Sequence, residues 1–484
     1  MPVLTFASQS ARRADDPGQS PERLVNLYPQ PGLESAKGGF PLRSVLGLTT
    51  FADLGITLTR AITAAAGSLW VAGSGSLFEI DSGGTVTNRG AIIDSVDTFI
   101  SSNGTKITIC AGGTYYVWDG STLDTIAGGR ITTEATVDFH AFYTLMTDST
   151  TGEFEWTVLN DPKTRSGLHF ATAESRNDNL RRVVVNGREV WLFGEESVEV
   201  WYAPGGAGAD AFKRLPGAAV NTGILAAGLA VQMADRVFFI DDKGVASQTD
   251  GLLIAPISTP PVEVAISEST PTHCFTYSDE GHLFFVIRFS DRPAWVFDVK
   301  TRRWHERGTG PTWNEWEIIA TARLNGVWYG VNTLGKIYSM SRTNDDAGMA
   351  LSRMTQSSNI YKGGDFFTIY RFELLGEVGT SEIPSDLLLD PDGNPLSDPD
   401  GVPILDVDGT EINIGRAVTV AFQISRDGGL TWEPQMFRSF GKIGEYRQRA
   451  IWNALGGAEQ MAGRVIITDK TDVNIYSSAN VEIA

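Results

Sequence analysis

The chain has 484 residues, a length at which a second packing unit usually accompanies the main hydrophobic core. Its formal net charge of −19 repels nucleic acid and anionic membranes, which disfavours tight DNA wrapping but suits a passage through which DNA slides. Only Cys110 and Cys274 occur, and no apolar run reaches the roughly 18 residues that span a bilayer. We expect a protein made in the cytoplasm, with no disulfide framework and no membrane insertion.

Residues 1–57 are rich in Pro and Gly and show little periodicity. The stretch DDPGQSPERLVNLYPQPGLESAKGGFP contains turn formers but lacks the long alternation of a strand. Because an extended segment gains order only by packing on another part of the chain, we expect an amino-terminal arm that contributes to a platform domain.

Between residues 58 and 348 a unit of alternating strands and tight turns repeats. The turns are 48 residues apart from Gly104 to Gly152 and 35 apart from Gly152 to Gly187, a spacing typical of propeller blades. The aligned turn positions are Gly67, Gly104, Gly152, Gly187, Asp235, Gly281 and Gly326.

Small sheets of this kind cannot bury both faces alone, and stacking them around an axis solves the problem. The 12 Trp, 12 Tyr and 24 Phe suit the wide wedges between such sheets. We therefore predict an all-β protein whose residues 58–348 form a β-propeller of about seven blades, with six as the alternative.

Residues 349–484 show a new strand pattern that predicts an antiparallel β-sandwich-like platform domain. An insertion at 382–413 repeats Asp-Pro-Asp-Gly, and each Asp-Gly supplies a turn. The repeat resembles part of a calcium loop but lacks the closing Glu at the twelfth position, and turn chemistry explains it without metal. We expect no metal and no cofactor.

The segment SRDGGLTW matches the Asp-box turn that occurs in sialidases and other glycan-handling propellers. In that turn a hydroxyl and a carboxylate bond the hairpin's own backbone while the Trp packs beneath it, which is structural work. The predicted structural motif comprises Ser425, Asp427, Gly429, Thr431 and Trp432.

No sequence pattern selects a catalytic site. The five histidines are scattered, and no HExxH, G-x-S-x-G or P-loop motif is present. A glycosidase needs a pair of carboxylates about 5 to 10 Å apart, and no spacing rule selects such a pair here. We predict that the protein is not an enzyme. Two alternatives to a structural role are a glycan-binding or glycan-cleaving propeller that recognises the host surface, and a scaffold for protein partners.

Basic residues gather at a few positions, which solvated strand ends explain for the most part. A phosphate-facing ring formed by symmetry is the other interpretation, because one Arg per subunit becomes several around an axis. These positions are Arg181, Arg182, Lys300, Arg302, Arg303, Arg323, Lys442, Arg447 and Arg449.

Three stretches resemble the packaged-DNA-stabilising tail hub, or nozzle, family of short-tailed bacteriophages. They are RLVNLYPQP with the following PGL, then VFDVKTRRWHERG, and the carboxy-terminal ISRDGGLTWEPQMFRSFGKIGEYRQRAIWNALGGAEQMAGRVIITD. In the third stretch the matching positions are Ser425, Asp427, Gly429, Trp432, Gly441, Gly444, Tyr446, Arg449, Trp452, Leu455 and Gly456. The insertion at 382–413 departs from the family pattern.

The resemblance implies a structural virion protein of the tail, assembled in the host cytoplasm. Members form a homohexameric ring below the head-to-tail connector, which narrows the exit for packaged double-stranded DNA and conducts the DNA during ejection. The implied partners are further copies of the chain, the connector or adaptor protein, and a tail needle, fibre or spike. Retention of DNA in such a ring is steric and needs no catalytic residue.

Overall fold

The computed structural model describes residues 3–5, 21–30, 40–378, 418–441, 449–470 and 473–483. The chain divides into two compact units, which we call the propeller unit (Leu48–Arg302 and Asn314–Ser341) and the sandwich unit (Met1–Gly47, Arg303–Trp313 and Arg342–Ala484). The insertion predicted at 382–413 lies outside the described residues. Nearly all regular structure is β, as predicted.

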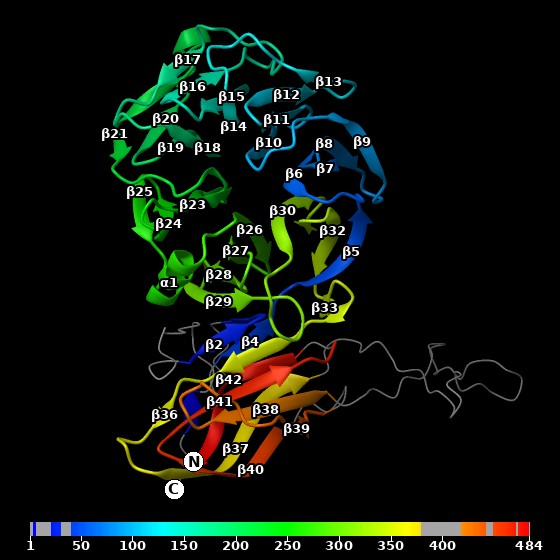
Figure 1. Ribbon diagram of the computed structural model, residues 1–484, viewed down its shortest axis with the longest axis vertical. Coiled ribbons are helices and arrows are strands. Elements are labelled where there is room, and N and C mark those ends of the chain that lie inside the picture. Colours follow the sequence, from blue (N-terminus) through cyan, green and yellow to red (C-terminus); the bar gives the residue numbers. More distant parts are fainter. Residues whose placement is uncertain are drawn as a thin grey trace, which may run out of the picture. The chain divides into compact units, whose positions relative to one another are not determined.

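Seven small antiparallel sheets surround one axis in the propeller unit (Figure 1). The predicted β-propeller of about seven blades is therefore confirmed. The first three sheets are β6 (Thr59–Ala65), β7 (Ser68–Gly73), β8 (Ser76–Ile80) and β9 (Val86–Ala91); β10 (Thr98–Ser102), β11 (Ile107–Ala111), β12 (Thr114–Trp118) and β13 (Leu123–Thr125); β14 (Glu134–His140), β15 (Tyr143–Asp148), β16 (Glu153–Trp156) and β17 (Phe170–Thr172).

The next two sheets, and three short helices, follow in chain order. They are β18 (Leu180–Asn186), β19 (Glu189–Gly194), β20 (Val198–Tyr202) and β21 (Lys213–Val220); β22 (Ala230–Met233), β23 (Arg236–Ile240), β24 (Ala246–Asp250) and β25 (Leu253–Pro256). The helices are η1 (Gly208–Asp210), η2 (Ala227–Leu229) and α1 (Pro260–Glu268).

The last two sheets of the propeller unit contain β26 (His273–Asp279), β27 (His282–Arg288) and β28 (Ala294–Asp298), and then β30 (Ile318–Leu324), β31 (Val327–Asn332) and β32 (Lys336–Ser341). In the seventh sheet β32 pairs with β5 (Gly47–Asp53), a strand that precedes the first blade in the chain. The ring is thus closed by a strand from before residue 58. Backbone hydrogen bonds from Leu54 to Gly335 (3.1 Å) and from Thr59 to Thr333 (2.7 Å) continue this closure.

Aromatic side chains fill the wedges between neighbouring sheets. The ring centroids of Trp70 and Trp118, from the first and second sheets, lie 6.0 Å apart. Those of Phe193 and Phe239, from the fourth and fifth sheets, lie 5.0 Å apart in an apolar cluster that joins both sheets. Large flat side chains suit these gaps because they bury much area with few rotatable bonds.

One predicted turn is wrong. Gly152 lies in the second hairpin of its sheet, between β15 and β16, whereas the first hairpin turns at Ala141 and Phe142. Both residues have left-handed backbones, with φ of 49° and 69°. Glycine is favoured at such positions, and its absence there hid the turn from sequence reasoning.

The sandwich unit contains two packed sheets. One has the order β3 (Leu27–Pro29), β4 (Pro41–Ser44), β42 (Val473–Ile483), β37 (Phe367–Val378) and β40 (Arg449–Ala458), with β1 (Val3–Thr5) on β42. In the other, β29 (Arg303–Arg307), β2 (Arg23–Val25), β35 (Arg353–Gln356), β41 (Gln460–Ile467), β38 (Thr419–Ser425) and β39 (Met436–Ser439) follow one another, with β36 (Ile360–Tyr361) on β41. The short strands β33 (Asp345–Asp346) and β34 (Met349–Ala350) pair with each other.

The sandwich core is aromatic at its centre. The rings of Phe372 and Phe422, from the two sheets, stack with centroids 4.4 Å apart, and Trp452 lies 5.1 Å from Phe422. The predicted sandwich is confirmed. Strands from all three predicted ranges, 1–57, 58–348 and 349–484, take part in it, and their status as separate domains stays a prediction.

Replacing Ile337 by alanine tests the closure of the propeller. Ile337 on β32 is fully buried in a cluster shared by the first and seventh sheets and by Ala52 of β5. We expect Ile337→Ala to lower the free energy of unfolding by about 2–5 kcal/mol, because a cavity replaces the side chain. Val327→Ala, at an exposed position in the same sheet, should change it by less than about 0.5 kcal/mol in the same urea titration. Equal effects of the two substitutions would contradict this account.

Candidate functional site

The three stretches singled out in the sequence meet in one sheet of the sandwich unit. Strand β2, from RLVNLYPQP, pairs in parallel with β29, from TRRWHERG, and antiparallel with β35. Strand β35 pairs with β41, and β41 pairs with β38, the strand that leads into the predicted Asp-box turn. Strands β2 and β41, from opposite ends of the chain, are thereby joined in one sheet through β35.

Arg23 and Glu306 form a two-pronged ion pair across the β2–β29 pairing. Nε of Arg23 lies 2.7 Å from Oε2 of Glu306, and Nη2 lies 3.0 Å from Oε1. The Glu306 side chain is buried. Burial lowers the pKa of Arg23, but the charge and hydrogen bonds of Glu306 outweigh burial and raise it. Planar, bidentate pairs of this kind fix orientation as well as charge, so the contact sets the register of β2.

Asn26 is the centre of a buried polar junction between β2 and β3. Its side-chain amide donates to the carbonyls of Gly308 (2.9 Å) and Ser352 (2.7 Å), and its Oδ1 accepts from the Gly308 N–H. Its backbone N–H donates to Glu306 and its carbonyl accepts from Val45. The backbone is left-handed, with φ of 56°, a conformation that Asn adopts more readily than most residues.

Three arginines extend the junction toward the end of the amino-terminal segment, and two of them, Arg307 and Arg353, are buried. Arg342 donates to the Tyr28 hydroxyl (2.8 Å) and to the Ser44 carbonyl (3.3 Å). Arg353 donates to the Ser44 hydroxyl (3.0 Å), and Arg307 donates to the Leu46 carbonyl. These cations hold oxygens of Tyr28, Ser44 and Leu46 from positions roughly 300 residues later in the chain. The junction therefore joins the amino-terminal segment to later parts of the sandwich unit.

The five residues of the predicted Asp-box motif run from Ser425, the last residue of β38, through the turn that follows it. The Ser425 hydroxyl donates to Asp427 (2.6 Å) and accepts from the Gly429 N–H (2.7 Å), and Asp427 accepts from the Thr431 N–H (2.9 Å). The ring of Trp432 lies beneath the Arg464 guanidinium, 4.3 Å from it. The hydrogen bonds of Ser425 and Asp427 are thus bonds within the turn, and the role of the motif stays a prediction.

The same turn packs on the amino-terminal segment. Gly429 has φ of 98°, and a Cβ there would stand 2.6 Å from the Cβ of Pro21, so that only glycine fits. The side-chain amide of Gln356 donates to the Pro21 carbonyl. The turn thus supports the place where β2 begins.

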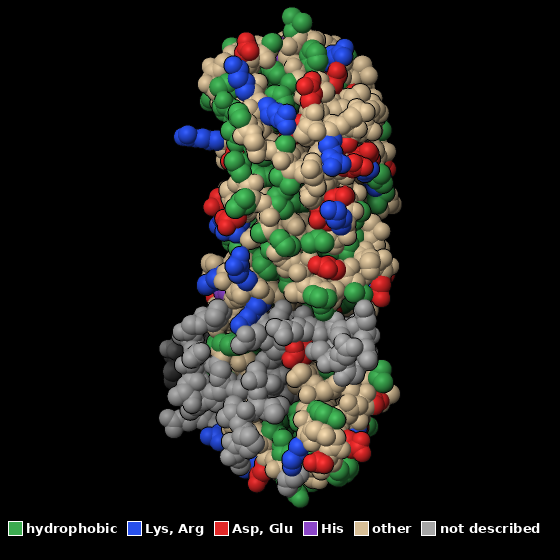
Figure 2. Space-filling view, turned by 90° about the vertical axis from the view of Figure 1, so that its left-hand side faces the viewer, with side chains coloured by type: hydrophobic (Ala, Val, Ile, Leu, Met, Phe, Trp, Pro, Cys, Tyr) green, Lys and Arg blue, Asp and Glu red, His purple; other side chains and the backbone are tan. Residues whose placement is uncertain are grey.

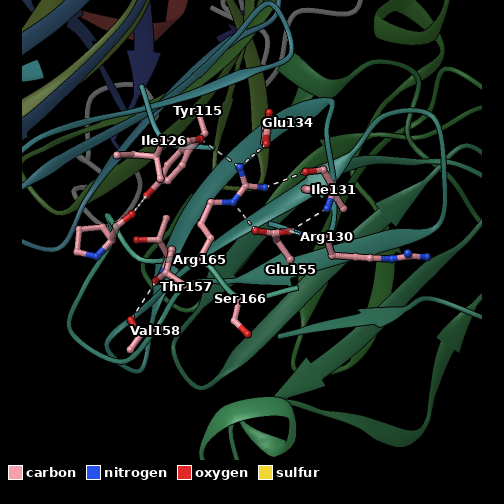
Figure 3. Close-up of polar contacts among 12 residues, drawn as sticks. Tyr115, Ile126, Arg130, Ile131, Glu134, Glu155, Thr157, Val158, Arg165 and Ser166 are labelled. Carbon is pink, nitrogen blue, oxygen red and sulfur yellow. Dashed lines mark hydrogen bonds and ion pairs between the residues drawn. The ribbon is translucent and has the colours of Figure 1, made fainter. Parts of the chain in front are cut away.

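A second polar cluster, which sequence reasoning missed, lies in the propeller unit around Arg165 (Figure 3). Its Nε lies 2.5 Å from Oε1 of Glu155 and its Nη1 lies 2.5 Å from Oε1 of Glu134. Nη2 donates to the Ile131 carbonyl (3.0 Å), and Oε2 of Glu155 accepts from the N–H groups of Arg130 and Ile131. No spacing signal links these residues, because they come from two strands of one blade, β14 and β16, and from the loops before β14 and after β16.

The Arg165 cluster brings together two buried carboxylates, the feature that a glycosidase would require. Burial raises the pKa of Glu134, although Arg165 opposes the shift. Both oxygens of Glu155 are engaged by Arg165 and by backbone N–H groups. The arrangement fixes the loop between β13 and β14 on β16, with each oxygen of Glu155 engaged in at least one hydrogen bond.

Within the described ranges, no group of three or more His, Cys, Asp or Glu side chains is placed to hold a metal ion. Across those same residues, no helix has the length and apolarity needed to cross a membrane. The predicted Asp-Pro-Asp-Gly turns of the insertion, which resemble part of a calcium loop, fall outside them.

The fold defines a class: a β-propeller whose chain also builds a β-sandwich from both of its ends. Two family models match this arrangement, "Bacteriophage P22 Gp10, beta-propeller" over residues 13–344 and "Bacteriophage P22 Gp10, beta-sandwich" over residues 404–484. The chain belongs to the bacteriophage P22 Gp10 family of structural tail proteins, as its three sequence stretches predicted. It is accordingly a structural protein of the phage virion.

Other comparisons add little. No curated protein sequence matches the chain. Among solved structures, the computationally designed Ika8 protein is 13% identical, with a TM-score of 0.39, and the match covers 69% of this chain and 97% of that one. A chain of the Mitotic Checkpoint Complex is 12% identical, with a TM-score of 0.38, covering 64% and 95% respectively.

Substituting Asn26 tests the polar junction. Asn26→Asp replaces the two donated hydrogen bonds by a carboxylate facing two buried carbonyls, so we expect a loss of at least about 3 kcal/mol in the free energy of unfolding. Asn325 is a matched control, because it is also left-handed but exposed. Asn325→Asp should cost less than about 0.5 kcal/mol. A small effect of Asn26→Asp in denaturant unfolding would exclude the junction as an anchor.

Acid titration tests the Asp-box turn. Burial disfavours the Asp427 carboxylate, but hydrogen bonds from Ser425 and Thr431 outweigh burial and lower its pKa to about 2. The folded pKa lies below the ordinary 3.8, so the stabilisation is present above that pH and is lost as pH falls toward 2. We expect Asp427→Asn to flatten the decline of melting temperature between about pH 5 and pH 3. The exposed control Asp365→Asn should leave the slope of the wild-type protein unchanged.

Proposed function

We propose that the chain is the subunit of a homohexameric tail hub, or nozzle, that lies below the head-to-tail connector, retains packaged DNA and conducts it during ejection. The observation that carries the proposal is membership of the P22 Gp10 family over both the propeller and the sandwich. Its partners in this role are further copies of the chain, the connector, and a tail needle, fibre or spike. Assembly takes place in the host cytoplasm.

The open edge of the sandwich supplies the ring interface. Strands β39 and β40 are the last strands of their two sheets, and among the described residues no further strand pairs with either. Phe437 on β39 is exposed, beside Arg438, whose Nε donates to the Ile451 carbonyl of β40 (3.1 Å). An unpaired edge with an exposed aromatic is a template for another chain, and a contact between unlike patches closes into a ring.

The described strands of the amino-terminal segment have partners within the same chain. Its strands β1 to β4 pair within the sandwich unit, so the described residues of the segment are used inside the subunit. That leaves the β39–β40 edge as the described surface best suited to join copies.

Charge supports passage of DNA without tight binding. Six subunits with a net charge of −19 each would give the ring a strongly repulsive field toward phosphate. On the face of the molecule shown in Figure 2, Lys and Arg side chains lie among Asp and Glu side chains, without a basic stripe along which a duplex could adhere. Retention would then be steric.

An aspartate at the β39 edge tests the ring. We expect Phe437→Asp to weaken association of subunits at least about tenfold, because a buried aromatic contact is replaced by a desolvated charge. Leu253→Asp is the control, since Leu253 is similarly exposed but lies on β25 of the propeller. Particle mass by light scattering and incorporation into tails by electron microscopy are the measurements.

Wild-type tails that hold this chain in a number other than six copies would refute the hexamer. Normal rings from Phe437→Asp would place the interface elsewhere.

A further inference from the structure

A cavity of about 560 Å³ lies at the axis of the propeller unit. Residues of the innermost strands β6, β10, β18, β22, β26 and β30 form its wall. A second hollow of about 440 Å³ shares Asp97, Phe99, Ala226 and Ala227 with the first, so the two adjoin. The wall therefore brings together side chains from the inner strands of several blades around the axis.

The wall is basic although the protein is acidic. Arg60, Arg182 and Arg288 line the larger cavity, and Asp97 is the acidic residue in its wall. Arg60 pairs with Asp94 at 2.9 Å, and Arg288 lies 3.9 Å from Glu315. Arg182 stacks on the ring of Phe99 at 4.2 Å. Among the described residues no carboxylate oxygen lies within 4.0 Å of its guanidinium, although the charge of Asp138 acts on it.

Polar atoms without partners gather in the same wall. Nε and Nη1 of Arg182, Nδ1 of His273 and Oγ1 of Thr59 are buried and have no hydrogen-bond partner among the described residues. Thr59 is only 2% exposed. Buried polar atoms without partners cost about 1–3 kcal/mol each, so a ligand that reached the atoms of this wall would stabilise the fold.

Asp138 is the acidic residue whose charge acts on Arg182, and its carboxylate already accepts hydrogen bonds from other groups. Asp138 on β14 accepts from the N–H groups of Val185 (2.8 Å) and Phe139 (2.8 Å) and from Ser101. Burial lowers the pKa of Arg182 to about 10, which leaves it cationic at neutral pH. Burial, with the positive charges of Arg288 and Arg60, lowers the pKa of His273 to about 4, so its ring is neutral there. The cavity thus offers fixed positive charge and neutral hydrogen-bonding groups.

We propose that this axial cavity binds a small oxyanion, either inorganic phosphate or a phosphate monoester. A guanidinium is a planar fork that matches phosphate oxygens, and Arg182 shares the cavity wall with Thr59 and His273 of two other blades, whose polar atoms would be further partners. The bound anion would join β18, β6 and β26 across the axis and so stabilise the closed propeller. The proposal does not depend on the ring described above.

Calorimetric titration of the full chain with inorganic phosphate tests the site. We expect binding in the wild-type chain and at least about tenfold weaker binding in Arg182→Met, which keeps the apolar stem and removes the charge-assisted bonds. Arg176→Met is the matched control, because Arg176 is exposed and pairs with Glu196 outside the cavity. The melting temperature should rise with phosphate, at constant ionic strength in chloride, in the wild type and the control only.

A second variant and a local probe cover the case in which Arg182→Met does not fold. Ala227→Asp, in the wall shared by both hollows, places a negative charge there without removing an arginine, and should also weaken binding. In NMR titration of labelled histidines, phosphate should raise the pKa of His273, because a nearby anion favours the imidazolium. No binding heat and an unmoved His273 resonance, or equal phosphate affinity in Arg182→Met, would overturn the proposal.

Discussion

The whole structure depends on one constraint: the backbone groups at the edges of its sheets must find partners, and the early part of the chain supplies them. Strand β5 pairs with β32 and closes the ring of blades, so the seventh blade combines residues near 50 with residues near 340. Strand β2 does the same in the sandwich, where it pairs with both β29 and β35. Each closure joins strands that are far apart in the chain and that would otherwise have open edges.

Polar side chains decide which strand fills each gap. Backbone pairing alone does not fix register, because a strand can slip along its partner. The Arg23–Glu306 pair and the fully bonded Asn26 fit at one register of β2, and a slipped strand would bury an unpaired charge and an unsatisfied amide. The stretches that identify the family are therefore the ones that hold the sandwich together, which explains why a structural protein has such distinct motifs without a catalytic site in view.

The propeller interior shows how a residue's environment can differ from its sequence context. Arg181 and Arg182 follow one another in a charged stretch that is typical of a solvated strand end, yet Arg182 lies on the innermost strand β18 and lines the axial cavity. Arg165, in a loop with no marked pattern, is nearly inaccessible and holds two carboxylates from one blade. Whether a cation faces water or a cavity depends on how the blades surround it, and alternation along one strand does not specify that.

Alternation, glycine turns and aromatic content were sufficient to determine from sequence the all-β class, a propeller of about seven blades and a carboxy-terminal sandwich, because these features follow from local geometry with periods of two and about 45 residues. The Asp-box turn is equally local, since Ser425, Asp427 and Thr431 bond within seven residues. Only the tertiary structure decided that the amino-terminal segment completes distant sheets, that Ala141 and Phe142 form a turn without glycine, and that Arg182 faces the axis. The physical reason is that strand pairing and burial are non-local: their partners lie up to hundreds of residues away, where no short pattern records them.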